Sequence, residues 1–106
     1  MKRGDVVWHK FKEPDKKRPV LIITRDGAIS ELNDVTVIPI TSKIRDLDSE
    51  VFLTMDQGMP QDCVANVDRI HTVPKHKLSG FITRVTDEQL DEVFTAMKFA
   101  FGFEDE

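Results

Sequence analysis

The chain has 106 residues, 40% apolar and 32% charged, a composition that predicts one globular domain over residues 1–106. No apolar run approaches the roughly 18 residues of a membrane helix, and the charged N-terminus is not followed by the apolar stretch of a signal peptide. Cys63 is the one cysteine, which excludes an internal disulfide and makes a reducing cytoplasm the expected location.

Charge is distributed unevenly along the chain. The net charge is −4, which disfavours bulk nucleic-acid binding. Residues 1–25 nevertheless hold eight Lys/Arg and three Asp/Glu, a local charge of +5, whereas residues 26–106 hold seven and sixteen, a local charge of −9. A surface that binds phosphate is therefore expected on the N-terminal part of the chain.

The N-terminal quarter predicts two strands around a basic loop. An apolar run that becomes alternating predicts a first strand over 5–11, and the loop covers 12–17. Four consecutive large apolar residues predict a central strand over 19–24, buried on both faces, with Pro19 at its first residue. Arg18 lies directly before it, either as a solvated surface charge or as a guanidinium fixed at the mouth of a rigid strand.

Short strands follow along most of the remaining chain. Pro39 places the next strand, 35–40, at an edge, a bulge or a strand end. Loops are expected over 25–34 and 44–49, a turn over 57–60, and a basic connector over 74–79. Further strands are expected over 50–54, 63–67, 70–73 and 80–84.

The C-terminal part predicts one helix. Thr86 and Gln89 have the spacing of a capping box, and Val85 and Leu90 that of a hydrophobic staple. An apolar stripe at helical spacing follows, Gly102 is expected to end the helix, and residues 104–106 form an acidic tail; the stripe comprises Leu90, Val93, Phe94, Met97 and Phe101. Many short strands and one helix predict a mostly antiparallel small barrel or sandwich with a helix packed on it.

Four sequence blocks resemble the MazF/PemK toxins, in the order and spacing of that family and over essentially the whole chain. They are Arg3-Gly4-Asp5-Val6-Val7-Trp8, Arg18-Pro19-Val20-Leu21-Ile22-Ile23, Ile38-Pro39-Ile40-Thr41-Ser42, and Asp68-Arg69-Ile70-His71-Thr72-Val73 with Lys75 and Leu78. The resemblance implies a mostly β fold, the SH3-like barrel with a C-terminal α-helix shared by MazF, PemK and CcdB. It also implies a homodimer and a metal-independent, sequence-selective endoribonuclease that cuts single-stranded RNA, inhibited by a small acidic antitoxin whose tail covers the active groove. No cofactor and no membrane partner are implied.

The resemblance also assigns site residues. It places the catalytic arginine of the family on Arg18, its catalytic threonine on Thr41, and a functional glutamate on Glu13. Such an enzyme uses the 2′-hydroxyl of RNA as nucleophile, so it must stabilise a dianionic phosphorane and move two protons. Contacts to RNA are expected from Lys16, Lys17, Ser42, Asp68 and Arg69, although the two lysines could equally be solvated. The His, Cys and carboxylate residues show no metal-ligand spacing.

One motif departs from the family pattern. Where the family often reads Asp-Gln-Ile-Arg-Thr, this chain has Arg69 two places earlier and His71 in the position of the arginine. We expect Arg69 to face the opposite side of the strand from position 71. His71 is either a structural strand residue or a proton-transfer group.

Two other functions remain open from the sequence. The same fold could poison a protein target such as DNA gyrase, as CcdB-like toxins do. It could also be a non-catalytic barrel that binds RNA or a peptide, since binding and catalysis would draw on the same arginine.

Overall fold

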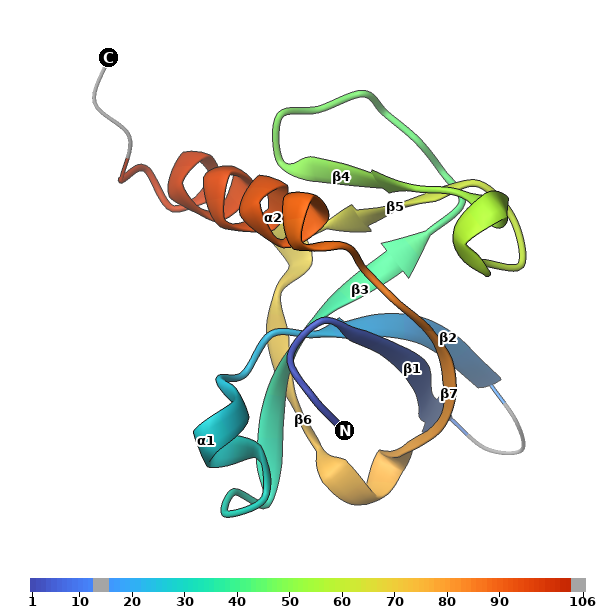
Figure 1. The fold of residues 1–106 in the computed structure, drawn as a ribbon, viewed down its shortest axis with the longest axis vertical. Coiled ribbons are helices and arrows are strands. Elements are labelled where there is room, and N and C mark those ends of the chain that lie inside the picture. The colour runs from blue at the N-terminus through green and yellow to red at the C-terminus, as the bar shows by residue number, and fades with distance from the viewer. Residues whose placement is uncertain (13–15, 104–106) are drawn as a thin grey trace.

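The computed structural model describes residues 1–12 and 16–103, and its strands form a curled antiparallel sheet beside one long helix (Figure 1). The strands are β1 (Asp5–Lys12), β2 (Lys16–Ile22), β3 (Asp34–Thr41), β4 (Glu50–Leu53), β5 (Cys63–Asn66), β6 (His71–Pro74) and β7 (Leu78–Arg84). The α-helices are α1 (Asp26–Ile29) and α2 (Asp87–Ala100), and single 3₁₀ turns are η1 (Met55–Gln57), η2 (Val67–Arg69) and η3 (Lys75–Lys77).

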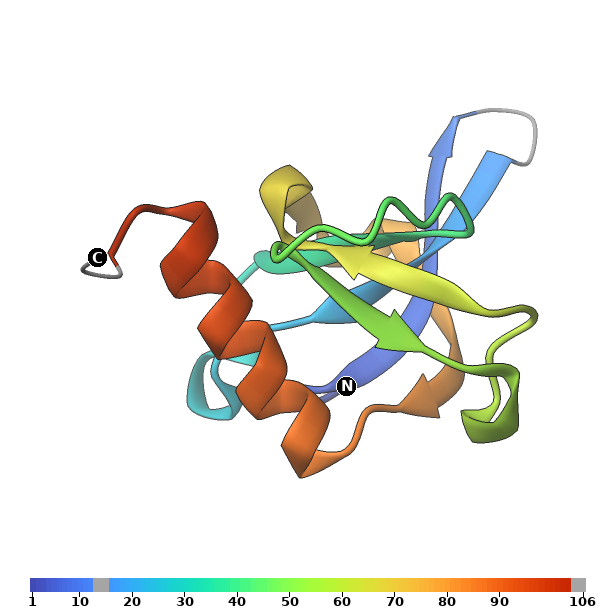
Figure 2. The same cartoon turned by 90° about the horizontal axis from the view of Figure 1, so that it is seen from above.

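The sheet runs in the order β4-β5-β3-β2-β1-β7, and β6 pairs with β3 outside this path. Every pairing is antiparallel, so the prediction of a small antiparallel barrel with a C-terminal helix is confirmed, the barrel being a half-barrel. Figure 2 shows α2 lying along one side of the curled sheet, where it packs on β4 and η2.

The central strand β2 separates two apolar clusters. Leu21 and Ile23 face the first core cluster, which α2 completes with Val93 and Ala96. Val20 and Ile22 face the second core cluster, on the other side of the sheet; its remaining members are Val7, Ile29, Val35, Val37, Val73 and Leu78. The prediction that this strand is buried on both faces is therefore confirmed.

Pro19 and Pro39 occupy places in their strands where no backbone donor is needed on one edge. Pro19 is the fourth residue of β2, not the first as predicted, because β1 and β2 continue their hairpin as far as the Lys12–Lys16 pair. Pairing of β2 with β3 begins only at Val20, so Pro19 lies where β2 has one neighbour. Pro39 lies where β3 leaves β6, after Val37, and before it joins β5 at Ile40.

The terminal helix follows its sequence signals closely. Thr86 and Gln89 form the predicted capping box, and Gly102 follows the C-cap residue with a φ of 74°. The apolar stripe ends earlier than predicted, because Phe101 is the C-cap residue, 45% exposed, and packs edge-on against Phe103 rather than on the core. Within the described residues no helix is long and apolar enough to cross a lipid bilayer.

Candidate functional site

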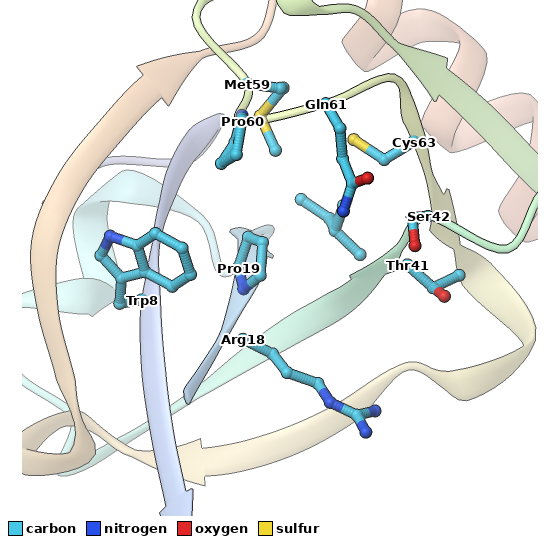
Figure 3. A pocket seen from close by; sticks show the side chains of 10 residues that line it. Trp8, Arg18, Pro19, Thr41, Ser42, Met59, Pro60, Gln61 and Cys63 are labelled. Atoms are coloured by element: carbon cyan, nitrogen blue, oxygen red, sulfur yellow. The ribbon is translucent and has the colours of Figure 1, made fainter. Parts of the chain in front are cut away.

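Arg18 and Thr41 lie close together where β2 and β3 run out of the core, and both line two adjacent cavities. Figure 3 shows the Arg18 guanidinium and the Thr41 hydroxyl directed to the same side of the first cavity. Arg18 is the third residue of β2, exposed and directly before Pro19 and the buried part of the strand. The sheet thus holds a cation and a hydroxyl at one place.

The first cavity, of about 360 Å³, has an apolar and aromatic wall. Trp8 and Pro19 are a cross-strand pair on one side, and Met59, Pro60 and Gln61 lie on the other (Figure 3). The Lys17 ammonium lies 4.9 Å from the centroid of the Trp8 ring. A flat ring, an amide and nearby cations are the groups that hold an unstacked base and its phosphate.

The second cavity, of about 410 Å³, is strongly cationic. Arg18, Lys43, Arg45 and Arg69 all line it, together with His71 and the buried Asn66. Its lining includes no Asp or Glu among the described residues. Guanidinium groups in this number favour an anion with several oxygens, such as a phosphodiester.

Thr41 has its hydroxyl oriented by the backbone. Its Oγ1 accepts a hydrogen bond of 3.1 Å from the Lys43 amide. Since a hydroxyl is one donor and two acceptors, its proton stays available to a phosphate oxygen in the cavity. This contact also turns the chain from β3 into the loop that carries Lys43 and Arg45.

A row of rings extends from Arg18 across the sheet. The Arg18 guanidinium carbon lies 5.1 Å from the Phe11 ring centroid, and the Phe11 and His9 centroids are 6.0 Å apart. The His9 and His71 centroids are 6.2 Å apart. Burial lowers the pKa of His9, and the charges of His71 and Lys77 lower it further. Together these three effects keep His9 neutral over more of the pH range.

Comparison with known proteins identifies the family. A family model described as "PemK-like, MazF-like toxin of type II toxin-antitoxin system" matches residues 2–101. The chain belongs to this family of toxins. It is 36% identical to "Probable endoribonuclease MazF2" of Mycobacterium tuberculosis over 103 residues, 96% of this chain and 99% of that one. "Mycobacterium tuberculosis toxin MazF-mt6" superposes with a TM-score of 0.87 at 32% identity, covering 95% and 99%.

A third relative extends the comparison within the MazF-like toxins. "Probable endoribonuclease MazF5" of Mycobacterium tuberculosis is 33% identical over 99 residues, which cover 92% of this chain and 90% of the relative. These alignments span nearly the full length on both sides, so both the sheet and the helix of the MazF-like fold are shared.

The structure brings together several of the residues expected in a MazF-like site. Arg18, Thr41 and Ser42 line the first cavity, and Arg18, Thr41 and Arg69 line the second. Lys16 and Lys17 are exposed on β2, with Lys17 beside Trp8. Glu13 lies outside the described residues, and its role stays a prediction.

Asp68 lines neither of the two cavities. Its carboxylate accepts a hydrogen bond of 2.5 Å from the Ser49 hydroxyl, and its amide donates to the Asn66 side chain at 3.1 Å. These bonds brace η2, the turn that presents Arg69. A contact between Asp68 and RNA stays a prediction.

The expectation that Arg69 and position 71 face opposite sides is wrong. Arg69 and His71 line the same cavity. The expectation was wrong because residues two apart in an extended chain share a side. In the structure Arg69 is the last residue of η2, and β6 begins two residues later at His71. This part of the toxin therefore presents a guanidinium and an imidazole together.

Sequence reasoning missed the residues that complete both walls. The sequence predicts a strand at Trp8 and a polar loop at Arg45 but no role for either, and Gln61 falls between the predicted turn 57–60 and the predicted strand 63–67. Glu50 holds that loop, since its Oε1 accepts the amides of Arg45 at 3.0 Å and Leu47 at 3.3 Å. The two basic residues in 41–45 were the sequence signal from which a cationic wall could have been predicted.

Among the described residues no three His, Cys, Asp or Glu gather into a possible metal site.

Proposed function

We propose that this chain is the toxin of a toxin–antitoxin pair and a metal-independent endoribonuclease that cuts single-stranded RNA at selected sequences. The observation that carries the proposal is the placement of Arg18 and Thr41 between an aromatic cavity and a cationic cavity. The family description and the endoribonuclease names of its relatives support the same reaction.

The roles follow from the chemistry of RNA cleavage. The neighbouring 2′-oxygen attacks phosphorus, the 5′-oxygen leaves, and the products carry a 2′,3′-cyclic phosphate and a 5′-hydroxyl. Arg18 offers two parallel N–H donors to the phosphorane, where charge accumulates. Thr41 donates its hydroxyl proton to the same phosphate. RNA supplies the nucleophile itself, so the reaction needs no metal-bound water as the attacking group.

The two cavities divide recognition of the substrate. Arg45, Lys43 and Arg69 suit the phosphates that flank the scissile one, which position RNA without reading its sequence. Trp8 and Gln61 suit one unstacked base, held by stacking and by hydrogen bonds to its edge. Ser42 adds a hydroxyl to the wall of the first cavity. We further propose that the protein works in the cytoplasm, where a lone cysteine stays reduced.

Cleavage of RNA in the presence of EDTA tests the proposal. Purified protein should cut a long single-stranded RNA, leave cyclic phosphate and 5′-hydroxyl ends, and spare the same RNA with a 2′-deoxy sugar at the cut. Arg18→Ala should slow cleavage by about 10²–10³-fold, since one charge-stabilising group is lost. Arg18→Lys should also be impaired, because an ammonium cannot make the paired contact.

Arg25→Ala is the matched control, because Arg25 is exposed at the start of α1 and lines neither cavity. It should cleave like the wild type. If EDTA stops the reaction and magnesium restores it, or if Arg18→Ala cleaves normally, the proposed mechanism is wrong. Absence of any cleavage together with inhibition of a protein target would instead favour a CcdB-like poison.

A further inference from the structure

His71 lies in the cationic cavity without an assigned function. It is the first residue of β6, its side chain is exposed, and it lines the cavity together with Arg18 and Thr41. Histidine is the side chain that gains and loses a proton near neutral pH, and His71 is the one histidine lining either cavity in the described part of the chain. Cys63 lines the other cavity, but burial and the charge of Asp62 raise its thiol pKa to about 11.

One hydrogen bond selects the tautomer of the neutral imidazole. The Nδ1 of His71 lies 2.9 Å from the backbone carbonyl oxygen of Arg69. A carbonyl oxygen can only accept, so Nδ1 carries the proton of the neutral ring. The Nε2 atom therefore has its lone pair free, which is the form that a general base requires.

Several elements bring charged or titratable groups to the cavity of His71 or to its neighbour His9. The groups are His9 of β1, Arg18 of β2, Lys43 and Arg45 of the loop after β3, Arg69 of η2, and Lys77 of η3, whose charge reaches His9. Each is a cation or an imidazole. Among the described residues lining this cavity no carboxylate competes with His71 for a proton.

Building on the ribonuclease function proposed above, we infer that His71 is a further catalytic residue, the general base that takes the proton from the attacking 2′-hydroxyl. As Nε2 accepts that proton, the 2′-oxygen bonds to phosphorus and the bond between phosphorus and the 5′-oxygen breaks. The leaving 5′-oxygen takes a proton from solvent, and the imidazolium returns its own proton to solvent. The overall reaction is a transesterification that neither gains nor loses protons.

His71→Asn separates this chemistry from structure, because its amide nitrogen can still donate to the Arg69 carbonyl while nothing replaces Nε2. His71→Gln is the complementary variant, with a polar atom near the position of Nε2 that does not titrate. His76→Asn is the matched control, since His76 is exposed on η3 and lines neither of these cavities.

Single-turnover cleavage should be about 10²–10⁴-fold slower in both His71 variants and unchanged in His76→Asn. The wild-type rate should rise with pH along an acidic limb of unit slope, and both His71 variants should lack that limb. Both His71 variants should bind an RNA with a 2′-deoxy sugar at the cut with an affinity within about threefold of the wild type. This is expected of a group that acts on the proton of the nucleophile rather than on binding.

A 5′-phosphorothiolate substrate tests the direction of proton transfer, because its thiolate leaves without needing a proton. If His71 is the base, the variants remain as defective on this substrate. Recovery on it would make His71 an acid and overturn the assignment, as would variants that keep at least a third of the wild-type rate or that lose only affinity. A wild type that cuts no RNA would overturn the ribonuclease function as well, so the two failures are distinguishable.

Discussion

His9 shows how the site affects stability at the level of one residue. Its half-buried ring lies between Phe11 and His71, and burial, His71 and Lys77 all lower its pKa from the ordinary value of 6.5. The folded protein therefore binds the His9 proton less tightly than the unfolded chain does. By linkage, stability rises with pH wherever the unfolded state binds more protons.

The resulting prediction concerns mild acid. His9 should cost no stability above its ordinary pKa of 6.5, and a growing penalty should appear as pH falls from there to the lowered folded-state pKa. His9→Gln should therefore lose less unfolding free energy than the wild type between about pH 7.5 and about pH 5, measured by urea titration at each pH. His76→Gln should behave like the wild type. Equal losses in all three proteins would contradict the prediction.

Some residues of the site could be predicted from the sequence and others could not. The closeness of Arg18 and Thr41 could be predicted because each lies at the end of an apolar run within a family motif. Trp8 and Gln61 could not, because their joint cavity depends on how β1 and the segment after η1 approach each other, which no local pattern encodes. Arg69 and His71 were misjudged because residues two apart in an extended chain share a side, so an arginine two places earlier keeps the same side.

Among the elements, β3 joins two parts of the sheet. It pairs with β6 up to Val37 and with β5 from Ile40, so Ile38 and Pro39 fall in the interval between partners. A proline there removes no bond on that edge, whereas in a continuous ladder it would. The strand then continues to Thr41 beside Arg18, so the change of partner helps to place the site.

Helix α2 gives a quantitative test. The Thr86 hydroxyl accepts the Gln89 amide at 3.1 Å, and the Gln89 side chain accepts the Thr86 amide at 3.0 Å. Thr86→Ala should therefore lower the unfolding free energy by about 1 kcal/mol, within the 0.5–2 kcal/mol of lost N-caps. Chemical denaturation measures this directly.

Thr95→Ala is the control within the same helix, because Thr95 is exposed in the interior of α2. Alanine has the higher helix propensity, so this variant should be neutral or slightly stabilised. Equal destabilisation by both substitutions would show that the cap contributes nothing specific.

The elements differed in how readily the sequence predicted them. The strands and α2 were predictable because alternation, long apolar runs and a capping box are local signals. Helix α1 was missed because it is a single turn of four residues whose N-cap, Arg25, makes no side-chain cap bond. Its burial comes from Ala28 and Ile29 reaching the sheet, a tertiary effect.

At the scale of the whole molecule, a cationic site is set into an acidic protein that also exposes large apolar side chains. The net charge is −4, yet four Lys/Arg residues line the second cavity. Exposed aromatics lie on β4, on β7, and at or just beyond the C-terminal end of α2: Phe52, Phe81, Phe99, Phe101 and Phe103. Such residues favour association with another protein surface.

We therefore expect a homodimer that is inhibited by a small antitoxin with an acidic tail. Sedimentation at micromolar concentration should give about twice the 12.1 kDa chain mass, and a saturating antitoxin should abolish RNA cleavage, because its acidic segment neutralises the groove around Arg18. Raising salt should weaken this inhibition. A fully active monomer would refute the dimer, and full cleavage by the saturated complex would refute occupation of the site.

The pairing of β1 with both β2 and β7 has a consequence during protein synthesis. The Asp5 carboxylate meets the Arg84 guanidinium at 2.9 Å, and α2 completes the first core cluster with Val93 and Ala96. A ribosome makes Arg18 and Thr41 long before it makes these partners, so the half-barrel cannot close on the early part of the chain. The emerging polypeptide therefore carries Arg18 and Thr41 before the sheet and helix that fix their geometry are complete.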